Sequence, residues 1–360
     1  INIKLNGVTM PVNQQVMDAG VINGLLQEIL SDEQFREFAK ALELNFGHAV
    51  DGIGNFRFSV FRQKGTPAFV VRYIPAEIPQ LGTLNVPDVL SEIIMEKRGL
   101  ILIVGATGSG KTTTLTAMLD YRNERKTGHI LTLEDPIEYI FKNKKSIVNQ
   151  REIGSDTHAF HVALKNALRQ APDCIFIGEI RDKETMSQAI GYAQSGHLCL
   201  STLHANNSYH AMSRVISLYP LENRQALLAD LAVSLKSIVS QRLTKRPDGT
   251  RFPAVEILLN SRHIAELIEE GDLSGIKDAM EQSMSPGSQT FEQDLFRLVR
   301  QGRISTDEAL ANADSATNLG LLLGNSGIMP AMAERVKHPT PGKMPGGPSF
   351  DEFKISEDSP

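Results

Sequence analysis

Hydrophobic positions in the first 74 residues change their spacing along the chain. They alternate with polar positions over Ile1–Val12, as in a strand, and recur at helical spacing over Val21–Leu44, which predicts one or two amphipathic helices. Two further alternating runs, Phe56–Phe61 and Ala68–Tyr73, flank a short turn that contains glycine. This order predicts a small α+β domain over residues 1–74.

The pattern changes after a proline-rich stretch. Residues 75–87 contain three prolines and a glycine, which predicts an extended linker. Beyond it, short apolar runs typical of buried strands alternate with amphipathic segments. The expected strands are Leu100–Val104, Ile130–Leu133, Cys174–Ile177 and Leu198–Leu203. The expected helices are Asp88–Lys97, Thr113–Tyr121, Asp156–Arg169 and Lys183–Gln194. Such alternation predicts an α/β domain with a parallel, doubly wound sheet over residues 88–261.

The last hundred residues contain two kinds of segment. Residues 262–323 show short amphipathic runs that predict a helical appendage, with helices over Ile264–Glu269, Gly275–Glu281, Thr290–Arg300 and Thr306–Ala313. From residue 327 to 360 the composition shifts to Pro, Gly, Lys, Ser and Asp. Such a segment buries too little apolar surface to offset the entropy of ordering, so a disordered tail is expected.

Composition narrows the class of protein. A chain of 360 residues with 41% hydrophobic residues can form two domains, and a net charge of −5 gives no reason to expect binding to nucleic acid. The two cysteines, Cys174 and Cys199, form no CxxC pair, so neither a stable zinc module nor a disulfide framework is expected. Apolar runs fall far short of the ~20 residues that a membrane helix needs. The first residue is Ile, which suggests that the natural N-terminus lies further upstream.

Residues 105–112 match the phosphate-loop pattern G-x-x-x-x-G-K-[ST] between an expected strand and an expected helix. The glycines let backbone N–H groups point at phosphate oxygens, Lys111 reaches the β- and γ-phosphates, and Thr112 offers its hydroxyl to Mg²⁺. The sequence therefore predicts that the chain binds ATP with Mg²⁺. The expected nucleotide-binding residues here are Gly105, Ala106, Thr107, Gly108, Ser109, Gly110, Lys111, Thr112 and Thr113.

Two expected strands run into acidic residues, Glu134 and Glu179. Ligands of open α/β sheets bind beyond the carboxyl ends of the strands, so both carboxylates are expected to face the nucleotide. We assign Glu179 to orientation of the attacking water, and Glu134 to the metal through its water shell. Glu138 is a weaker candidate, and the alternative for all three is that they only cap helices.

Histidines flank the strand expected over Leu198–Leu203. His204, at its carboxyl end, could hydrogen-bond to the γ-phosphate, whereas His197 lies at its start and is harder to place. The alternative for both is a structural role. His158 and His161 add no recognisable metal-ligand spacing, so a metal cluster is not predicted.

Five segments in series resemble motifs of the secretion-superfamily hexameric ATPases. They match the Walker A, Asp box, VNQRE, Walker B and His box motifs, and are Gly105–Thr114, Leu133–Glu138, Val148–Glu152, Pro172–Asp182 and Gly196–His204. Within that superfamily the chain is most similar, over roughly Ile1 to Leu323, to the type IV pilus retraction ATPases of the PilT/PilU family. The resemblance implies a PAS-like domain over residues 1–74, a RecA-like core over 88–261, and a ring of six subunits.

The resemblance also implies that ATP binds between the two domains of one subunit, and that arginines from a neighbouring N-terminal domain can complete the site. Arg57 and Arg72 match those family arginines, and Arg62 is a weaker candidate. Guanidinium groups suit the role because they stay charged and bind phosphate bidentately. The alternative is that both are solvated strand arginines.

Departures from the family pattern favour the PilU-like branch. Residues 263–270 align with a retraction motif usually written AIRNLIRE, but Ala265 and Glu269 replace both arginines. Ala171 replaces an acid common in PilT-like sequences, and the extended proline-containing tail is PilU-like. These departures suggest an accessory ATPase that acts with a PilT-like partner.

The function so predicted is an ATP-hydrolysing hexameric motor for type IV pilus retraction, either a homo-hexamer or a mixed ring with a PilT-like paralogue. It is expected to act on an inner-membrane platform protein from the cytoplasmic face, with residues 75–87 as its hinge. One alternative is a pilus-assembly or type II secretion motor, against which the lack of a four-cysteine zinc module argues. The others are a non-catalytic accessory ring subunit and a nucleic-acid translocase.

Overall fold

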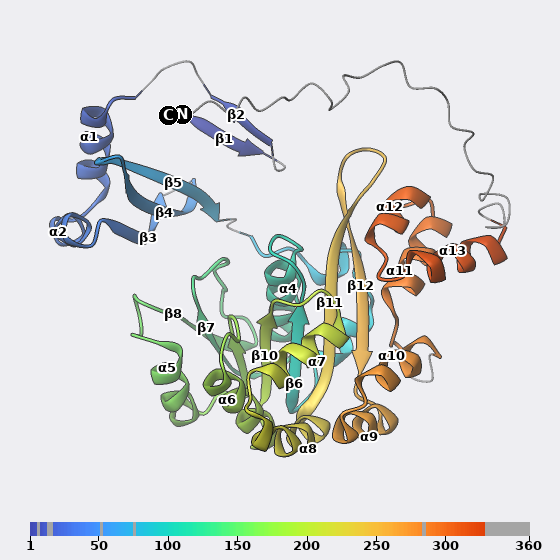
Figure 1. Ribbon diagram of the computed structural model, residues 1–360. Helices are drawn as coiled ribbons and strands as arrows, with labels where there is room; N and C mark the ends of the chain where they lie inside the picture. Colours follow the sequence, from blue (N-terminus) through green and yellow to red (C-terminus); the bar gives the residue numbers. More distant parts are fainter. Residues whose placement is uncertain (6–7, 13–16, 51–52, 75–76, 283–285, 328–360) are drawn as a thin grey trace, which may run out of the picture.

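The computed structural model describes residues 1–5, 8–12, 17–50, 53–74, 77–282 and 286–327 (Figure 1). A three-stranded sheet with two helices leads into a seven-stranded sheet covered by helices, and further helices follow. Among the described residues, no helix has the length and apolarity to span a membrane. The tail expected over residues 327–360 lies outside the described residues except for its first position.

The N-terminal part contains a hairpin, two helices and an antiparallel sheet. The hairpin pairs β1 (Asn2–Leu5) with β2 (Val8–Pro11). The helices are α1 (Ala19–Ile29) and α2 (Asp32–Ala41), and the sheet order is β3 (Glu43–Val50), β4 (Gly54–Gln63) and β5 (Thr66–Ile74). One face of the sheet packs on the helices through a core of Leu26, Leu30, Phe38, Leu44, Phe46, Phe58 and Val60. The predicted α+β character of this part matches the structure.

Local signals end the second helix earlier than the hydrophobic spacing predicts. Ser31 begins α2 with a capping box that includes Gln34, and Leu42 adopts φ 66°, which stops the helix. The helical prediction over Val21–Leu44 is therefore wrong at its end, because Glu43 and Leu44 already belong to β3. Leu44 is buried in the same core as the apolar faces of α1 and α2, so an apolar residue at this position does not distinguish a strand from a helix.

The large sheet has the order β12-β11-β6-β10-β9-β7-β8, and all neighbouring pairs are parallel except β11 with β12. Its strands are β6 (Gly99–Val104), β7 (Gly128–Glu134), β8 (Ser146–Glu152), β9 (Cys174–Ile177), β10 (Leu198–Leu203), β11 (Leu235–Lys245) and β12 (Arg251–Leu259). Every residue of β6, β9 and β10 is buried, which explains their continuous apolar runs. The predicted parallel sheet is confirmed, with β8, β11 and β12 added.

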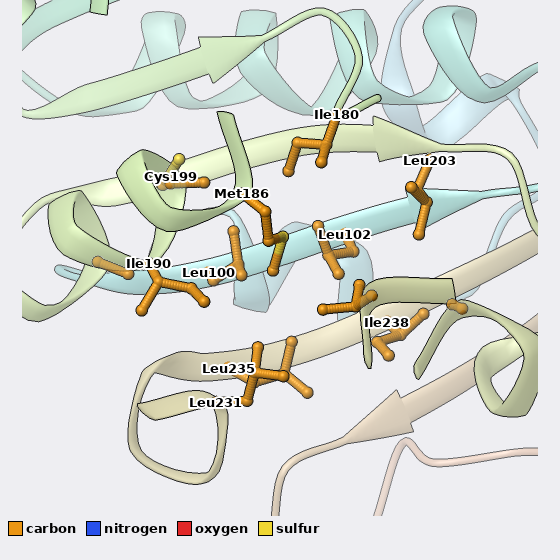
Figure 2. Close-up of a cluster of buried hydrophobic side chains, with 14 of the residues drawn as sticks. Leu100, Leu102, Ile180, Met186, Ile190, Cys199, Leu203, Leu231, Leu235 and Ile238 are labelled. Atoms are coloured by element: carbon orange, nitrogen blue, oxygen red, sulfur yellow. The ribbon is translucent and has the colours of Figure 1, made fainter. Parts of the chain in front are cut away.

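Helices cover both faces of this sheet, so the side chains of β6 alternate between two cores. Leu100 and Leu102 face α6 (Lys183–Gln194) and its neighbours, as Figure 2 shows. The helices on that face are α5 (Phe160–Ala167), α6, α7 (Ser208–Ser217), α8 (Arg224–Ser234), α9 (Arg262–Glu270) and α10 (Leu273–Glu281). Ile101 and Ile103 face α3 (Val89–Ile93) and α4 (Lys111–Arg125).

Helix boundaries follow local hydrogen bonding as well as periodicity. The strands Cys174–Ile177 and Leu198–Leu203 and the helix Lys183–Gln194 have the predicted bounds. The helix predicted from Asp156 instead begins at Phe160, because the Asp156 carboxylate accepts a hydrogen bond from the Glu152 amide in the turn that ends β8. The helix predicted over Asp88–Lys97 is shorter and spans Val89–Ile93.

The last three helices of the chain pack on the β11–β12 edge of the sheet. Helices occur at all four predicted places, and α13 (Ala316–Asn325) adds a fifth. α11 (Phe291–Arg300), α12 (Thr306–Asn312) and α13 share a small core with β12, built from Phe252, Ala254, Phe291, Leu295, Leu298, Ile304, Ala309, Leu319 and Leu323. This appendage therefore rests directly on the antiparallel β11–β12 pair (Figure 1).

Replacing Leu102 by alanine tests the contribution of the central strand. Leu102 is fully buried between β6 and the helices of one face, so the variant should lose about 2–5 kcal/mol in the free energy of unfolding. Leu221→Ala is the control, since Leu221 is 78% exposed and its truncation should change stability by less than about 0.5 kcal/mol. Chemical denaturation followed by circular dichroism measures both, and equal effects would contradict this account of the core.

Candidate active site

The phosphate loop leaves β6 at Val104 and enters α4 at Lys111, so strand and helix hold it from both ends. Two glycines bring it close to β11. A Cβ atom at Gly105 would lie 2.4 Å from the carbonyl oxygen of Gln241, and one at Gly110, where φ is 87°, would lie 2.7 Å from the Gln241 amide nitrogen. Only glycine fits at both positions. Glycine also lets the loop backbone curl around a phosphate.

The Gln241 side chain fastens this loop to β11. Its Nε2 donates to the carbonyl of Ser109 at 2.9 Å, and its Oε1 accepts from the Thr114 hydroxyl at 2.8 Å. Gln241 is buried, and it lies more than a hundred residues from the loop in sequence. Sequence reasoning missed this residue, because polar side chains are frequent along β11 and no local pattern marks this one.

Lys111 points along the loop. Its Nζ donates to the carbonyl oxygens of Gly105 at 2.9 Å and Ala106 at 3.0 Å, and the residue is buried. Burial lowers the pKa of the Lys111 ammonium, while the negative charges of Glu179 and Glu138 act in the opposite direction. The loop thus carries the buried Lys111 ammonium close to the carboxylates of Glu179 and Glu138.

A cleft of about 500 Å³ opens beside the loop and gathers most of the predicted site residues. The members that line it are Arg72, Thr107, Gly108, Gly110, Lys111, Thr112, Thr113, Glu134, Glu138, Glu179 and His204. Gly105, Ala106, Ser109 and Arg57 are not among its lining residues. The walls also include Asp135, Phe160, Phe176, Thr202 and Leu243, which were not predicted.

Glu134 is almost fully buried at the end of β7. It accepts hydrogen bonds from the Thr132 hydroxyl at 2.7 Å and from Gln150 Nε2 at 3.1 Å. Burial raises the pKa of Glu134 to about 7, although both hydrogen bonds act to lower it. The carboxylate is therefore held in a fixed orientation at the wall of the cleft.

Gln150 in β8 connects Glu134 to the loop that follows β7. Its Nε2 also donates to the Tyr139 carbonyl at 2.8 Å, and its Oε1 accepts from the Phe141 amide at 2.8 Å. The Tyr139 hydroxyl in turn lies 3.1 Å from the Thr113 hydroxyl. The segment Val148–Glu152 was known from the sequence only as a motif, and the structure shows that it positions the acidic segment.

Glu179 and His204 come from neighbouring strands and meet in the cleft. His204 Nε2 lies 3.2 Å from Glu179 Oε1, and Arg181 Nε donates to Glu179 Oε2 at 2.7 Å. Arg181 also lies 3.7 Å from Asp135. The sequence analysis assigned no role to Arg181, although its spacing two residues after Glu179 was visible. His197 instead contacts Ser195 and Tyr192 at the opposite end of β10.

Arg57 and Arg72 lie directly opposite each other on β4 and β5. Arg72 reaches the cleft of its own chain, and both arginines line a smaller adjoining pocket together with Ile137, Glu138 and Tyr139. Arg57 Nη1 is buried with no hydrogen-bond partner among the described residues. The N-terminal sheet therefore presents two guanidinium groups toward the acidic segment, and their role in binding a ligand stays a prediction.

Comparison with known proteins identifies the family to which the chain belongs. Residues 56–266, more than half of the chain, match the family described as Type II/IV secretion system protein. The chain belongs to this family. The type IV pilus ATPase PilU of Pseudomonas aeruginosa is 45% identical over 323 residues, 89% of this chain and 85% of PilU. The PilT retraction ATPase of the same organism is 38% identical, over 88% of this chain and 92% of PilT.

The fold of the chain is also similar to that of a solved structure. The pilus retraction motor PilT with bound ADP superimposes with a TM-score of 0.81 at 38% identity, over 87% of this chain and 90% of the other. The predicted RecA-like core and membership of the PilT/PilU ATPases are confirmed. The identity to PilU exceeds the identity to PilT, as the departures from the retraction motif predicted.

Replacing Gln241 by alanine tests whether this side chain holds the phosphate loop. The variant leaves the Ser109 carbonyl and the Thr114 hydroxyl without their buried partner, at about 1–3 kcal/mol for each unpaired group. Affinity for MgATP, measured by calorimetry, should therefore fall about tenfold or more. Thr244→Val is the matched control, because Thr244 lies on the same strand but donates to Phe252. Equal affinities for the two variants would contradict the assignment.

Proposed function

We propose that this chain is an ATP-hydrolysing subunit of a ring-shaped motor that retracts type IV pili. The observation that carries the proposal is the convergence of Lys111, Glu179 and His204 on one cleft beside a glycine-rich loop. Its similarity to PilU and PilT supports the same conclusion. ATP is the substrate, and phosphoryl transfer to water is the reaction.

The loop suits a triphosphate because its glycines carry no Cβ atom, so backbone N–H groups can approach the phosphate oxygens. Lys111 adds a positive charge that is largely buried. Mg²⁺ fits the oxygen donors beside it, which are the Thr112 hydroxyl and, through water, the Glu134 carboxylate. When bound, the metal ion neutralises charge on the phosphate oxygens. The hydrogen bonds from Thr132 and Gln150 keep the Glu134 carboxylate oriented for that task.

Glu179 orients the attacking water. Its carboxylate is fixed from two sides, by His204 Nε2 at 3.2 Å and by Arg181 Nε at 2.7 Å, so it can hold a water in line with the γ-phosphate. His204 also offers a hydrogen bond to the γ-phosphate, while Arg72 and Arg57 add positive charge from the N-terminal domain. Phosphoryl transfer depends mainly on such positioning and charge stabilisation.

The proposed assembly is a hexamer of this chain, or a mixed ring with a PilT-like paralogue, that acts on an inner-membrane platform protein at the cytoplasmic face. Nucleotide turnover would change the contact between the N-terminal domain and the core, with residues 75–87 as the hinge. The accessory, PilU-like role is supported by α9, where Ile264, Leu267 and Ile268 are buried and Glu269 is exposed. An acidic surface thus replaces the basic one that the retraction motif carries.

Glu179→Gln tests the assignment of the water-orienting residue. The variant keeps the shape of the side chain but loses the carboxylate charge, so ATP hydrolysis should fall by about 10²–10⁴-fold while MgATP binding is retained. Phosphate release measures the first quantity and calorimetry the second. Glu184→Gln provides the control, because Glu184 is exposed in the first turn of α6 and lines no part of the cleft. Unchanged turnover in Glu179→Gln would remove Glu179 from this role.

A retraction assay tests the accessory role. Cells that lack all related ATPases are complemented with this chain alone, or with this chain and a PilT-like partner. We expect retraction only with both, and no added effect of this chain when it carries Lys111→Ala, which weakens phosphate binding. Full retraction by this chain alone would refute the partner-dependent role and leave the ATPase assignment intact.

A further inference from the structure

The segment that follows His204 is fastened to the C-terminal helices. Asn206 lies two residues after His204, and its carbonyl oxygen accepts a hydrogen bond from Arg242 Nη2 at 3.1 Å. The next residue, Asn207, donates through Nδ2 to the Asp314 carboxylate at 2.6 Å. Asp314 lies between α12 and α13, so Asn207, four residues after the end of β10, contacts the appendage.

Arg242 occupies the centre of these contacts. Its guanidinium forms an ion pair with Asp314 and donates to the Asn312 carbonyl, and its Cζ lies 3.9 Å from the centre of the fully buried Phe291 ring. One side chain of β11 therefore joins α11, the α12–α13 connection and the segment after His204. The Arg242 and Asp314 side chains are only 21% and 19% exposed, so water screens their attraction less than at an open surface.

Further hydrogen bonds join this segment to α7 and β12. Asn207 caps α7 by accepting a hydrogen bond from the His210 amide at 2.8 Å. The Ser208 amide donates to Glu256 of β12 at 2.7 Å, and Ser240 of β11 donates to the same carboxylate oxygen. The segment after His204 is thus joined to its neighbours by direct hydrogen bonds, so a displacement of His204 would act on those bonds.

We propose that Arg242 is a positioning residue that couples nucleotide contact at His204 to α12 and α13. The inference rests on the proposed function, in which His204 meets the γ-phosphate. When His204 shifts toward the phosphate, Asn206 and Asn207 move with it, and the Arg242–Asp314 pair carries that shift to the appendage. Gln241, the preceding residue on β11, holds the phosphate loop, so consecutive residues of one strand contact both ends of the connection.

Amide hydrogen exchange of the whole chain, with and without the non-hydrolysable nucleotide AMP-PNP and Mg²⁺, tests this coupling. In the unmodified chain we expect the nucleotide to slow exchange at residues 105–112 and to change it at residues 306–325. In Arg242→Ala the effect at 105–112 should persist and the nucleotide-dependent change at 306–325 should disappear. Turnover should fall about 2- to 30-fold, with nucleotide affinity changed by less than about twofold.

Two further variants separate coupling from folding. Asp314→Asn keeps the shape of the side chain but removes its charge, and it should also abolish the change at 306–325, so it decides the question if Arg242→Ala is unstable. Arg246→Ala is the matched control, because Arg246 pairs with Asp248 at 3.6 Å and lies over the Phe252 ring, and within the described part of the chain its side chain forms no hydrogen bond or ion pair with residues 204–208. It should behave as the unmodified chain.

The outcomes distinguish the coupling from the underlying ATPase function. A nucleotide-dependent change at 306–325 that survives both Arg242→Ala and Asp314→Asn would overturn the coupling, even if exchange there became faster in all states, because that result indicates a merely structural role. Absence of the change in the unmodified chain would overturn it as well. Absence of any nucleotide effect at 105–112 in the unmodified chain would instead contradict the proposed function.

Discussion

Burial of β6, β9 and β10 on both faces is the constraint on which the rest of the molecule depends. Their side chains lie between two layers of helices, so polar groups can persist there only with partners. Ser201 and Thr202 of β10 satisfy this condition by donating to the carbonyls of Ile177 and Gly178. Charged side chains of the site therefore lie at the carboxyl ends of the strands. There the phosphate loop, Glu179 and His204 line one cleft.

Two glutamines then set the geometry of that cleft. Gln241 ties the phosphate loop to β11, and Gln150 ties Glu134 to the segment after β7. An amide can donate and accept at once without carrying charge, which suits a buried bridge between backbone and side chain. The strands that carry them, β8 and β11, lie on opposite sides of the central strands and so enclose the cleft from both directions.

The same strand links the cleft to the periphery. On β11, Gln241 meets the phosphate loop while its neighbour Arg242 meets Asp314 and Phe291 of the appendage. On the opposite side of the cleft, Arg72 reaches it from the N-terminal sheet. The candidate site is therefore connected to both flanking parts of the chain, to the N-terminal sheet through Arg72 and to the appendage through consecutive residues of β11.

The sequence by itself determined the features that depend on neighbours along the chain. The phosphate loop, the buried strands, most of the helices and the position of Glu134 and Glu179 at strand ends follow from spacing and residue type, since backbone geometry and periodicity are local properties. The PilT/PilU family also followed from motifs in series. Local signals were weaker where polar residues interrupt the strands, so β3, β8, β11 and β12 were not predicted.

Only the tertiary structure decided which side chains meet. Periodicity shows that a strand exists but not which strand lies beside it, so the 3.2 Å contact of Glu179 with His204 required the order of β9 and β10. Gln241 and Arg242 depend on partners from distant parts of the chain, and no local pattern marks either residue. The raised pKa of Glu134 likewise arises from burial, which is a property of the folded sheet.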